Sequence, residues 1–464
     1  MFHGCVILAG TSGESRFFPI TEGLPKAVLP VGNRPLVTYL LRTLLVKCGV
    51  ARCVVVTTSR YERAVRGAVA DFRNADVAVV DEMVGSAGAV REALSNDEGL
   101  RQCREVLVVS GECCLGFRSV LRLVETHRLQ GVDCTMLVRR GTDDAEDSEV
   151  MVLSGDRVAD KVSAMELDDD AEDGEGRIRV AKALLRRSPR LVVRTDLLDV
   201  HAYVFSKEAL LGAIENGGPS QSLRADVVPG LATAYFRAPP EDLVEGYDLY
   251  ERMMADDDDD GGGGGGSIRP RGVVAVVAKE PRQQQQQPRA QQREGGDAEE
   301  KEEDDDPVGA EFVARIRSIG AYAQLCRHVV ARANLTFPLD GKILKRDGAL
   351  VGPDARLGEK VTLKNTTIGA RAVIGTRCKI NNSVVFDDAV IEEGCVVQNS
   401  IVCKRATVKT KSNLNEVQVG EAAVVPANSQ LKQEAFTAGS FGDDDDDDDD
   451  DEDPISSSGP ASLG

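Results

Sequence analysis

The sequence predicts an α/β domain followed by a left-handed parallel β-helix, and three observations support this fold class. Short apolar runs alternate with helical patterns through the first two-thirds of the chain, which is typical of βαβ units. From residue 351 onward the apolar residues recur in steps of six, six and five. The composition is that of a globular protein, because 42% of the 464 residues are hydrophobic, enough for two or three domains with their own cores.

The chain up to residue 140 contains apolar runs that predict buried strands and amphipathic stretches that predict helices. The predicted strands are residues 5–9, 53–57, 77–80, 105–110 and 135–138, and the predicted helices are residues 35–48, 88–94 and 119–129. Strands that alternate with helices in this way favour a mostly parallel sheet covered on both faces.

Two segments of biased composition interrupt the later part of this domain. Residues 255–270 run from aspartate to glycine, and residues 281–307 run from glutamine to acidic residues, so neither can build a core. The apolar run 272–278 between them predicts a late strand of the same domain, and the helical pattern 310–333 closes it. The domain is therefore expected to cover residues 1–335.

The β-helix is predicted by a regular repeat, in which one period is the sum of the steps of six, six and five. Its apolar positions are Val351, Leu357, Leu363, Ile368, Ile374, Ile380, Val385, Ile391, Val397, Val402, Val408, Leu414 and Val419. Small residues (Ala355, Ala372, Ala389, Ala406) and asparagines (Asn365, Asn382, Asn399) share the same period. An α-helix would drift out of phase within one repeat, so each repeat is predicted to be one triangular coil with an asparagine ladder at a corner. We expect the β-helix to cover residues 336–430.

The net charge of −20 lies in three acidic runs. Residues 256–260, 297–306 and 443–453 contribute −5, −7 and −11, together −23, so the remainder of the chain sums to +3. A nearly neutral remainder gives little support to direct nucleic-acid binding. The tail 431–464 is expected to be disordered, and its acidic run is interpreted as a solvating extension rather than a docking segment.

The sequence favours a cytosolic protein that does not contact membranes. The N-terminus lacks the features of a signal peptide, and no apolar stretch approaches twenty residues. The 11 cysteines are scattered, odd in number and without paired metal-ligand spacing, so we interpret them as small core residues.

Two segments near the N-terminus carry features of a phosphate site. A turn rich in Gly and Ser, residues 10–16, follows the first predicted strand and would let backbone N–H groups approach phosphates. By itself such a turn is equally compatible with a tight connection between a strand and a helix. The stretch Leu-Pro-Lys-Ala-Val-Leu-Pro-Val-Gly-Asn-Arg-Pro-Leu at residues 24–36 adds a lysine, Lys26.

With Gly85-Ser86-Ala87-Gly88-Ala89 and Ser110-Gly111-Glu112, these segments make the chain resemble the sugar-phosphate nucleotidyltransferases, the sugar-nucleotide pyrophosphorylases. The resemblance implies a Rossmann-like mixed sheet. It also implies a triphosphate held by the glycine-rich loop and Lys26, a nucleobase beside residues 85–89, and a divalent cation, commonly magnesium, at the strand end that carries Glu112. Such enzymes join a sugar phosphate oxygen to the α-phosphate of a nucleoside triphosphate.

The chain departs from that family where the chemistry is done. Glu112 stands where the family has Asp, and Ser318 stands at the second Asp, although a neutral hydroxyl is a poor ligand for a hard cation. The phosphate loop has Thr11 in place of a second Gly, and His201 replaces a Gly beside the sugar. We therefore assign no catalytic residue, metal or cofactor and leave residual binding of a nucleotide or sugar nucleotide open. The candidates for a vestigial pocket are Gly10, Gly13, Arg16, Lys26, Gly85, Ser86, Ala87, Glu112, Asp199 and His201.

The same departures resemble the gamma subunits of eukaryotic translation initiation factor two B, the complex that exchanges GDP for GTP on initiation factor two. This resemblance implies a non-catalytic structural and regulatory subunit that pairs with the epsilon subunit and contacts the other subunits. It also implies that initiation factor two is the substrate of the complex. The alternative is an active pyrophosphorylase that makes GDP-mannose or ADP-glucose. Ser318 separates the two hypotheses in the sequence.

Overall fold

The computed structural model describes most of the two predicted domains. The described residues are 4–10, 17–82, 84–141, 149–155, 157–163, 188, 190–215, 222–237, 270–278, 313–332, 344–346 and 348–437. The biased segments up to residue 269 and over 281–307, most of the acidic tail, and the sites Gly13 and Arg16 lie outside these residues.

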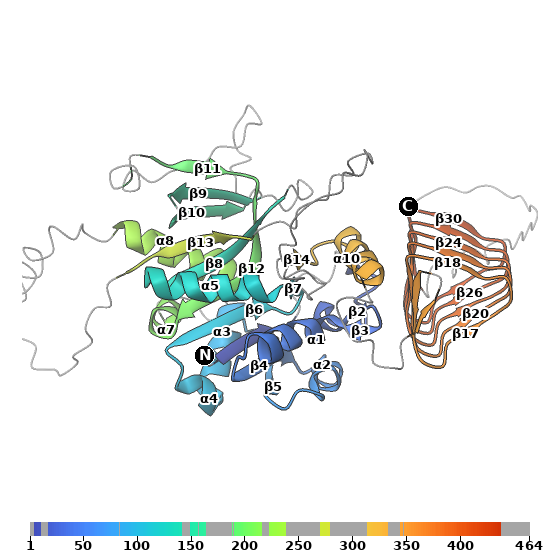
Figure 1. The fold of residues 1–464 in the computed structure, drawn as a ribbon, viewed down its shortest axis with the longest axis horizontal. Helices are drawn as coiled ribbons and strands as arrows, with labels where there is room; N and C mark the ends of the chain where they lie inside the picture. The colour runs from blue at the N-terminus through green and yellow to red at the C-terminus, as the bar shows by residue number, and fades with distance from the viewer. Residues whose placement is uncertain are drawn as a thin grey trace, which may run out of the picture.

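A ten-stranded sheet forms the centre of the N-terminal part (Figure 1). In spatial order its strands are β11 (Val192–Arg194), β9 (Glu149–Ser154), β10 (Arg157–Ser163), β13 (Val273–Val277), β8 (Cys134–Arg140), β12 (Leu197–Ser206), β6 (Glu105–Ser110), β1 (Gly4–Leu8), β4 (Arg52–Thr58) and β5 (Ala75–Val80). The predicted mixed α/β class is confirmed, and β13 is the late strand expected between the two biased segments.

The expectation of a mostly parallel sheet is wrong. Strands β1, β4, β5 and β6 pair in parallel, as βαβ units require, and so do β8 and β13. Strand β12, however, lies antiparallel between β6 and β8, and β9, β10 and β11 extend the sheet by antiparallel pairings. Apolar runs predict that a strand is buried but do not encode its direction, and only the early strands alternate with helices.

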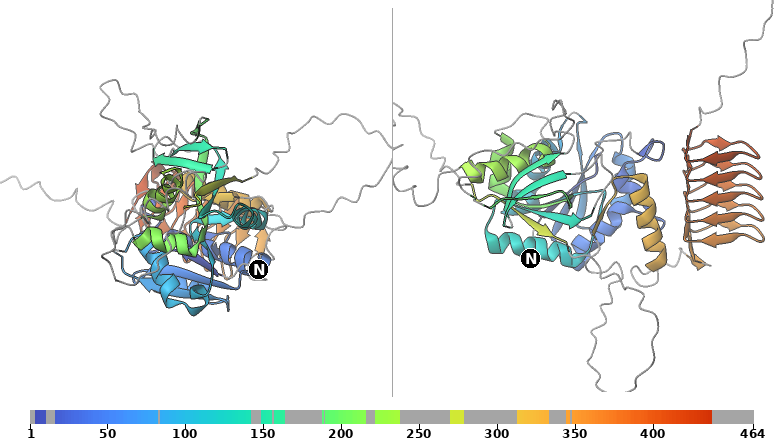
Figure 2. Two further views of the ribbon diagram at one scale, coloured as in Figure 1. Left: turned by 90° about the vertical axis from the view of Figure 1, so that its left-hand side faces the viewer. Right: turned by 90° about the horizontal axis from the view of Figure 1, so that it is seen from above.

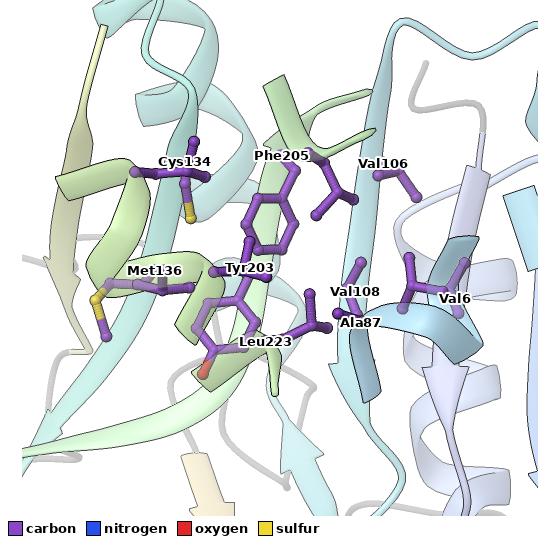
Figure 3. Packing of buried hydrophobic residues seen from close by; sticks show 14 of the residues in the cluster. Val6, Ala87, Val106, Val108, Cys134, Met136, Tyr203, Phe205 and Leu223 are labelled. Carbon is purple, nitrogen blue, oxygen red and sulfur yellow. The ribbon is translucent and has the colours of Figure 1, made fainter. Parts of the chain in front are cut away.

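Helices cover both faces of the sheet. One face packs against α3 (Ser86–Asn96), α7 (Lys207–Glu215) and α8 (Val228–Arg237), and the other against α1 (Leu36–Leu41), α2 (Glu62–Val69) and α5 (Phe117–Gln130). Alternation along β1 shows the division, because Val6 faces the first layer and Cys5 and Ile7 face the second. Figure 3 shows the first layer, where Tyr203 and Phe205 pack near Val106 and Val108.

Two predicted helices differ from expectation. The helix predicted at 35–48 begins as α1 but continues as a π-helix, Arg42–Lys47. Within the range 310–333, the chain first forms β14 (Val313–Arg315), which pairs with β7 (Cys113–Leu115), and only then α10 (Ile319–Arg332). The alternating Val-Ala-Arg-Ile-Arg stretch before Ser318 indicates a strand, which the prediction of a helix over residues 310–333 did not include.

The C-terminal part is a parallel β-helix with three sheets, as predicted (Figure 2). Its first face contains β15 (Leu344–Arg346), β16 (Ala349–Val351), β19 (Thr366–Ile368), β22 (Val384–Val385), β25 (Ile401–Val402), β28 (Gln418–Val419) and β31 (Ala435–Phe436). The second face contains β17 (Arg356–Leu357), β20 (Val373–Ile374), β23 (Val390–Ile391), β26 (Thr407–Val408) and β29 (Val424–Val425). The third face contains β18 (Thr362–Lys364), β21 (Lys379–Asn381), β24 (Val396–Gln398), β27 (Asn413–Asn415) and β30 (Gln430–Lys432).

The register confirms the predicted repeat. Ile368 pairs with Val385, Ile374 with Ile391, and Ile380 with Val397, each one period further along the chain. The predicted apolar positions form the core of the β-helix, with Leu357 partly exposed at its first coil. The predicted ladder is also present. Asn365, Asn382 and Asn399 share positive φ angles of 49°, 49° and 48°, and the Asn365 amide donates to Asn382 Oδ1 at 3.3 Å.

The first face of the β-helix packs against the N-terminal domain through α10 (Figures 1 and 2). Val384, Ile401 and Cys403 contact a cluster that includes Tyr322 and Leu325 of α10. The hairpin between β2 (Pro30–Val31) and β3 (Arg34–Pro35) joins the same contact, where the Asn33 amide donates to Ile368 O at 2.8 Å. The two parts therefore share a continuous apolar interface.

All 11 cysteines are free thiols, and ten of them are buried, with Cys48 half-buried. This agrees with the interpretation of cysteine as a small core residue. None of the described helices is long and apolar enough to span a bilayer. The predicted boundary at residue 335 stays a prediction. Residues 431–436, which were expected to belong to a disordered tail, instead contain the end of β30 and all of β31, so the β-helix continues past residue 430.

Candidate functional site

A cavity of about 360 Å³ opens beyond the carboxyl ends of β1 and β6. In open α/β sheets this edge is where ligands bind. Five predicted residues line it, namely Gly10, Lys26, Ser86, Glu112 and His201. Three others lie nearby without lining it: Gly85 caps the start of α3, Ala87 is buried in the core behind Ser86, and Asp199 is buried beneath His201.

Glu112 is the centre of an ion-pair triad at the end of β6. Both the Nε and Nη2 atoms of Arg315 donate to its Oε1, at 3.0 and 2.9 Å, and Lys26 Nζ donates to its Oε2 at 3.3 Å. The three side chains are only 11–14% exposed. Strand β14 supplies Arg315, since its pairing with β7 places this residue opposite Cys113, next to Glu112. Lys26 also lies over the ring of Phe17, 4.6 Å from the centroid.

The triad holds Glu112 in its ionised form. Burial alone would raise the pKa of the Glu112 carboxyl group, but the charges of Arg315 and Lys26 outweigh this effect and lower the pKa to about 2. Burial likewise opposes the charge of Arg315, and the neighbouring carboxylate overcomes it and raises the pKa of Arg315. Each charge in this nearly dry position is therefore stabilised by its partners.

Ser318 occupies a structural position at the start of α10. Its Oγ accepts a hydrogen bond from the backbone N–H of Ala321 at 3.2 Å, three residues further on. This is the geometry of an N-cap, which satisfies one of the free N–H groups in the first helical turn. The hydroxyl of Ser318 thus stabilises a helix terminus.

These residues do not fit a divalent cation. A hard cation needs carboxylate oxygens with free lone pairs, whereas both oxygens of Glu112 accept from cationic groups and the oxygen of Ser318 accepts from a backbone N–H. The guanidinium of Arg315 contributes positive charge at the strand end where the resemblance implied a cation. Among the described residues, no group of three or more His, Cys, Asp or Glu side chains could hold a metal ion.

His201 lies in a bulge of β12. The pairing of β12 with β8 shifts between Asp199 and Tyr203, and His201 adopts a φ of 59°, a conformation that favours glycine. Asp199 stabilises the bulge, because Oδ1 accepts from the His201 backbone N–H at 2.8 Å and Oδ2 accepts from the Tyr203 hydroxyl at 2.5 Å. The imidazole therefore projects from a backbone shape suited to glycine and lines the cavity.

The segment Gly85 to Ala89 forms the first turn of α3. The Ser86 hydroxyl accepts from the backbone N–H of Leu223 at 2.9 Å, which ties α3 to the π-helix Leu223–Val227. Leu223 packs beside Tyr203, and Ala87 lies near Val108 in the same cluster (Figure 3). The hydroxyl of Ser86 is thus already engaged by the protein.

Three cationic residues of the cavity were not identified as site residues from the sequence. Arg224, Arg315 and Arg317 line it together with Lys26, whereas Glu112 is the one carboxylate among the described lining residues. Arg317 is buried and donates to Asp199 O at 2.9 Å. Arg315 and Arg317 are separated by one residue, so strand alternation could have placed both side chains on the side of the cavity. The described lining therefore favours anions.

Comparison with protein families identifies both parts of the chain. Residues 5–148 match the nucleotidyl transferase family, and residues 340–434 match the family described as the left-handed β-helix domain of eIF2B subunit epsilon. The two matches fall on the sheet with its cavity and on the three-faced β-helix.

Individual relatives include both classes of protein considered from the sequence. The chain is 23% identical over 239 residues to translation initiation factor eIF2B subunit gamma of Dictyostelium discoideum, covering 48% of this chain and 54% of that protein. It is 22% identical over 244 residues to the Schizosaccharomyces pombe eIF2B subunit gamma, covering 50% and 51%. A bifunctional sugar-1-phosphate nucleotidylyltransferase/acetyltransferase of Sulfurisphaera tokodaii is 34% identical over 94 residues, covering 20% and 22%. The chain thus spans about half the length of the gamma subunits that it matches.

The fold and the cavity define a nucleotidyltransferase-like protein with a C-terminal left-handed β-helix. Within this class, the chain is similar to the gamma subunits of translation initiation factor eIF2B, which confirms the resemblance recognised from its motifs.

Proposed function

We propose that this chain is a non-catalytic structural and regulatory subunit of an eIF2B-type guanine-nucleotide-exchange factor in the cytosol. It pairs with an epsilon-type subunit and contacts the other subunits. The substrate of the assembled complex is initiation factor two. The similarity to two gamma subunits and to the eIF2B β-helix family supports this assignment.

The observation that carries the non-catalytic part is the triad of Lys26, Glu112 and Arg315. Nucleotidyl transfer places negative charge on the leaving pyrophosphate, and a cation held by carboxylates neutralises it. Here the carboxylate of Glu112 is neutralised by two protein cations, and Ser318 caps α10. The former catalytic groups therefore contribute to the stability of the fold.

The architecture suits a subunit that holds others together. The shared apolar interface through α10 fixes the β-helix on the N-terminal domain, so both present their surfaces in a defined relative orientation. The first face of the β-helix is covered by this interface, so partners are expected to bind elsewhere on the β-helix or on the N-terminal domain. Function is assigned from similarity and from the site rather than from the fold alone.

A pyrophosphate-release assay tests the proposal against an active pyrophosphorylase. The full chain, a hexose 1-phosphate, magnesium and either GTP or ATP are combined, with a known pyrophosphorylase assayed in parallel. We expect release at the level of the Lys26→Ala variant, which lacks the phosphate-side lysine. Magnesium-dependent release that Lys26→Ala abolishes would contradict the proposal and favour the enzyme.

A further inference from the structure

The charged side chains on the third face of the β-helix are all positive. Its outward positions, together with the corner that precedes it, form three columns that repeat once per coil, beginning at Lys360, Thr362 and Lys364. Six residues of these columns are basic, all exposed, and none is acidic: Lys360, Lys364, Arg377, Lys379, Lys411 and Lys432. We call these six residues the basic face. Strands β18, β24 and β30 mark its position in Figure 1.

A pattern of mixed charges occurs at the corner between the first and second faces. There Arg371 pairs with Asp388 at 2.7 Å and Arg405 with Glu421 at 2.6 Å, so cations and carboxylates alternate between coils. Within the part of the chain that the structure describes, no residue of the basic face has an ion-pair partner. Three carboxylates, those of Glu359, Glu393 and Glu416, lie at its border. The Glu393 carboxylate accepts from the Thr376 hydroxyl, and the Glu416 carboxylate accepts from the Gln433 amide.

Stacking like charges costs free energy. Adjacent strands are about 4.8 Å apart, so Lys360 and Arg377 occupy neighbouring positions of one column, and like charges at such positions repel. Neutral side chains would avoid this repulsion, as Asn365, Asn382 and Asn399 do in the first coils of the next corner. The arrangement is stabilised when a segment of opposite charge covers it.

The chain itself contains such a segment. Residues 443–453 are eleven consecutive acidic residues, and Thr437, the last described residue, belongs to the same coil as Lys432. The five intervening residues can span up to about 17 Å, and the acidic run about 36 Å when extended. The basic face needs less, because the four coil steps from Lys364 to Lys432 amount to about 19 Å.

Composition alone favours a solvating extension for the acidic run 443–453, but from this complementarity we infer that the run docks in cis on the basic face. Tethering gives the run a high effective concentration at this face, and several charge pairs act together where one exposed pair contributes little. Docking is sensitive to salt, since exposed charges are screened beyond about 8 Å at physiological ionic strength. The tail thereby covers a basic surface and makes any acidic partner compete for it.

Zero-length carbodiimide crosslinking of the full chain, followed by peptide mass spectrometry of the monomer fraction, tests the inference. We expect the acidic run to link to Lys360, Lys364, Lys379 and Lys411 about tenfold more often than to Lys404, an exposed lysine at the opposite corner. Raising the salt to about 0.5 M should remove the preference, because screening then acts within a few ångströms. Equal labelling of Lys404, or links found only in crosslinked dimers, would overturn docking in cis.

A second measurement uses a labelled peptide of eleven acidic residues and three full-length proteins. A chain whose residues 443–453 are changed to Asn and Gln should bind the peptide, and the unmodified chain should bind it at least tenfold more weakly, because its own tail occupies the face. Adding Lys360→Gln, Lys364→Gln and Lys379→Gln to the neutral-tail chain should abolish binding, whereas adding Lys404→Gln and Lys409→Gln should not. Equal binding by the unmodified and neutral-tail chains, or equal loss in the two lysine variants, contradicts the inference.

Discussion

Arg315 and Glu112, 203 residues apart in the chain, meet through two hydrogen bonds from one guanidinium to a single carboxylate oxygen. The contact depends on β14, which pairs with β7 and thereby returns the chain to the end of β6. This residue pair couples the closing segment of the N-terminal domain to the end of β6, where Glu112 lies. The charges of Glu112 and Arg315 thus become part of the folded framework.

Removal of the guanidinium should destabilise the protein. Arg315→Met leaves Glu112 nearly buried with Lys26 as its remaining partner in the triad, and we expect a loss of about 3–5 kcal/mol in the free energy of unfolding, measured by urea denaturation. Arg315→Met combined with Glu112→Gln should recover part of this loss, because no buried carboxylate then lacks its neutralising charge. Additive losses in the double variant would show that the two side chains are not coupled.

Ser318 should matter as a helix cap. Ser318→Ala removes the acceptor for the Ala321 N–H and should cost about 1 kcal/mol of unfolding free energy. Ser318→Asp keeps an oxygen at the cap and should retain stability, and it should also leave pyrophosphate release at background because Glu112 is still held by Arg315. Loss of stability in both variants would argue against a capping role.

Gly32 should be required where the β-helix meets the N-terminal domain. It has a φ of 56°, and a Cβ there would come within 2.9 Å of Val329 Cγ1 and 3.2 Å of Leu350 Cδ1. Gly49 is the matched control, with a φ of 66° and nothing within 4 Å of a Cβ. Both alanine variants bear the backbone cost of about 1–2 kcal/mol, and Gly32→Ala should lose about 1–3 kcal/mol more by thermal unfolding. Equal losses would show that the joint adjusts freely.

His127 should make stability depend on pH. It is buried on α5 and shares a 3.0 Å hydrogen bond with Thr135, and burial lowers its pKa to about 4. In the unfolded chain this histidine binds a proton below about pH 6.5, whereas in the folded chain it stays neutral down to about pH 4. Lowering the pH through this range therefore favours the unfolded state. Its contribution to stability should fall by up to about 1.4 kcal/mol per pH unit between pH 6.5 and 4. Urea denaturation at several pH values in this range gives the free energy of unfolding as a function of pH. This dependence on pH should be weaker in His127→Gln, and an unchanged dependence would exclude His127 as its source.

Much of the fold could be predicted because it is encoded locally. The regular recurrence of Ile374, Ile391 and Val408 defines one inward position per coil, and pairing through parallel strands reproduces that period. The direction of β12 could not be predicted, because its apolar residues are compatible with either orientation of a buried strand. Strand β14 was predicted as part of the neighbouring helix. The spacing of Arg315 and Arg317, with one apolar residue between them, is nevertheless that of side chains on one face of a strand.

The candidate site was predictable in position but not in chemistry. Motif resemblance located Lys26, Ser86, Glu112 and His201, and the fold brings all four to one cavity. The partner of Glu112 could not be inferred, because the contact between Arg315 and Glu112 spans 203 residues and depends on the pairing of β14 with β7. Sequence spacing does not report such long-range pairing, and the roles of the site residues stay proposals.

Quantitative affinity purification from the source cells tests the proposed function most directly. The tagged full chain is recovered at near-physiological salt, and the proteins that accompany it are identified and quantified by mass spectrometry, with an unrelated tagged protein as the control. We predict near-stoichiometric recovery of an epsilon-type subunit and the other exchange-factor subunits, together with initiation factor two. Recovery of the chain alone or as a homo-oligomer would contradict the assignment and favour an independent enzyme.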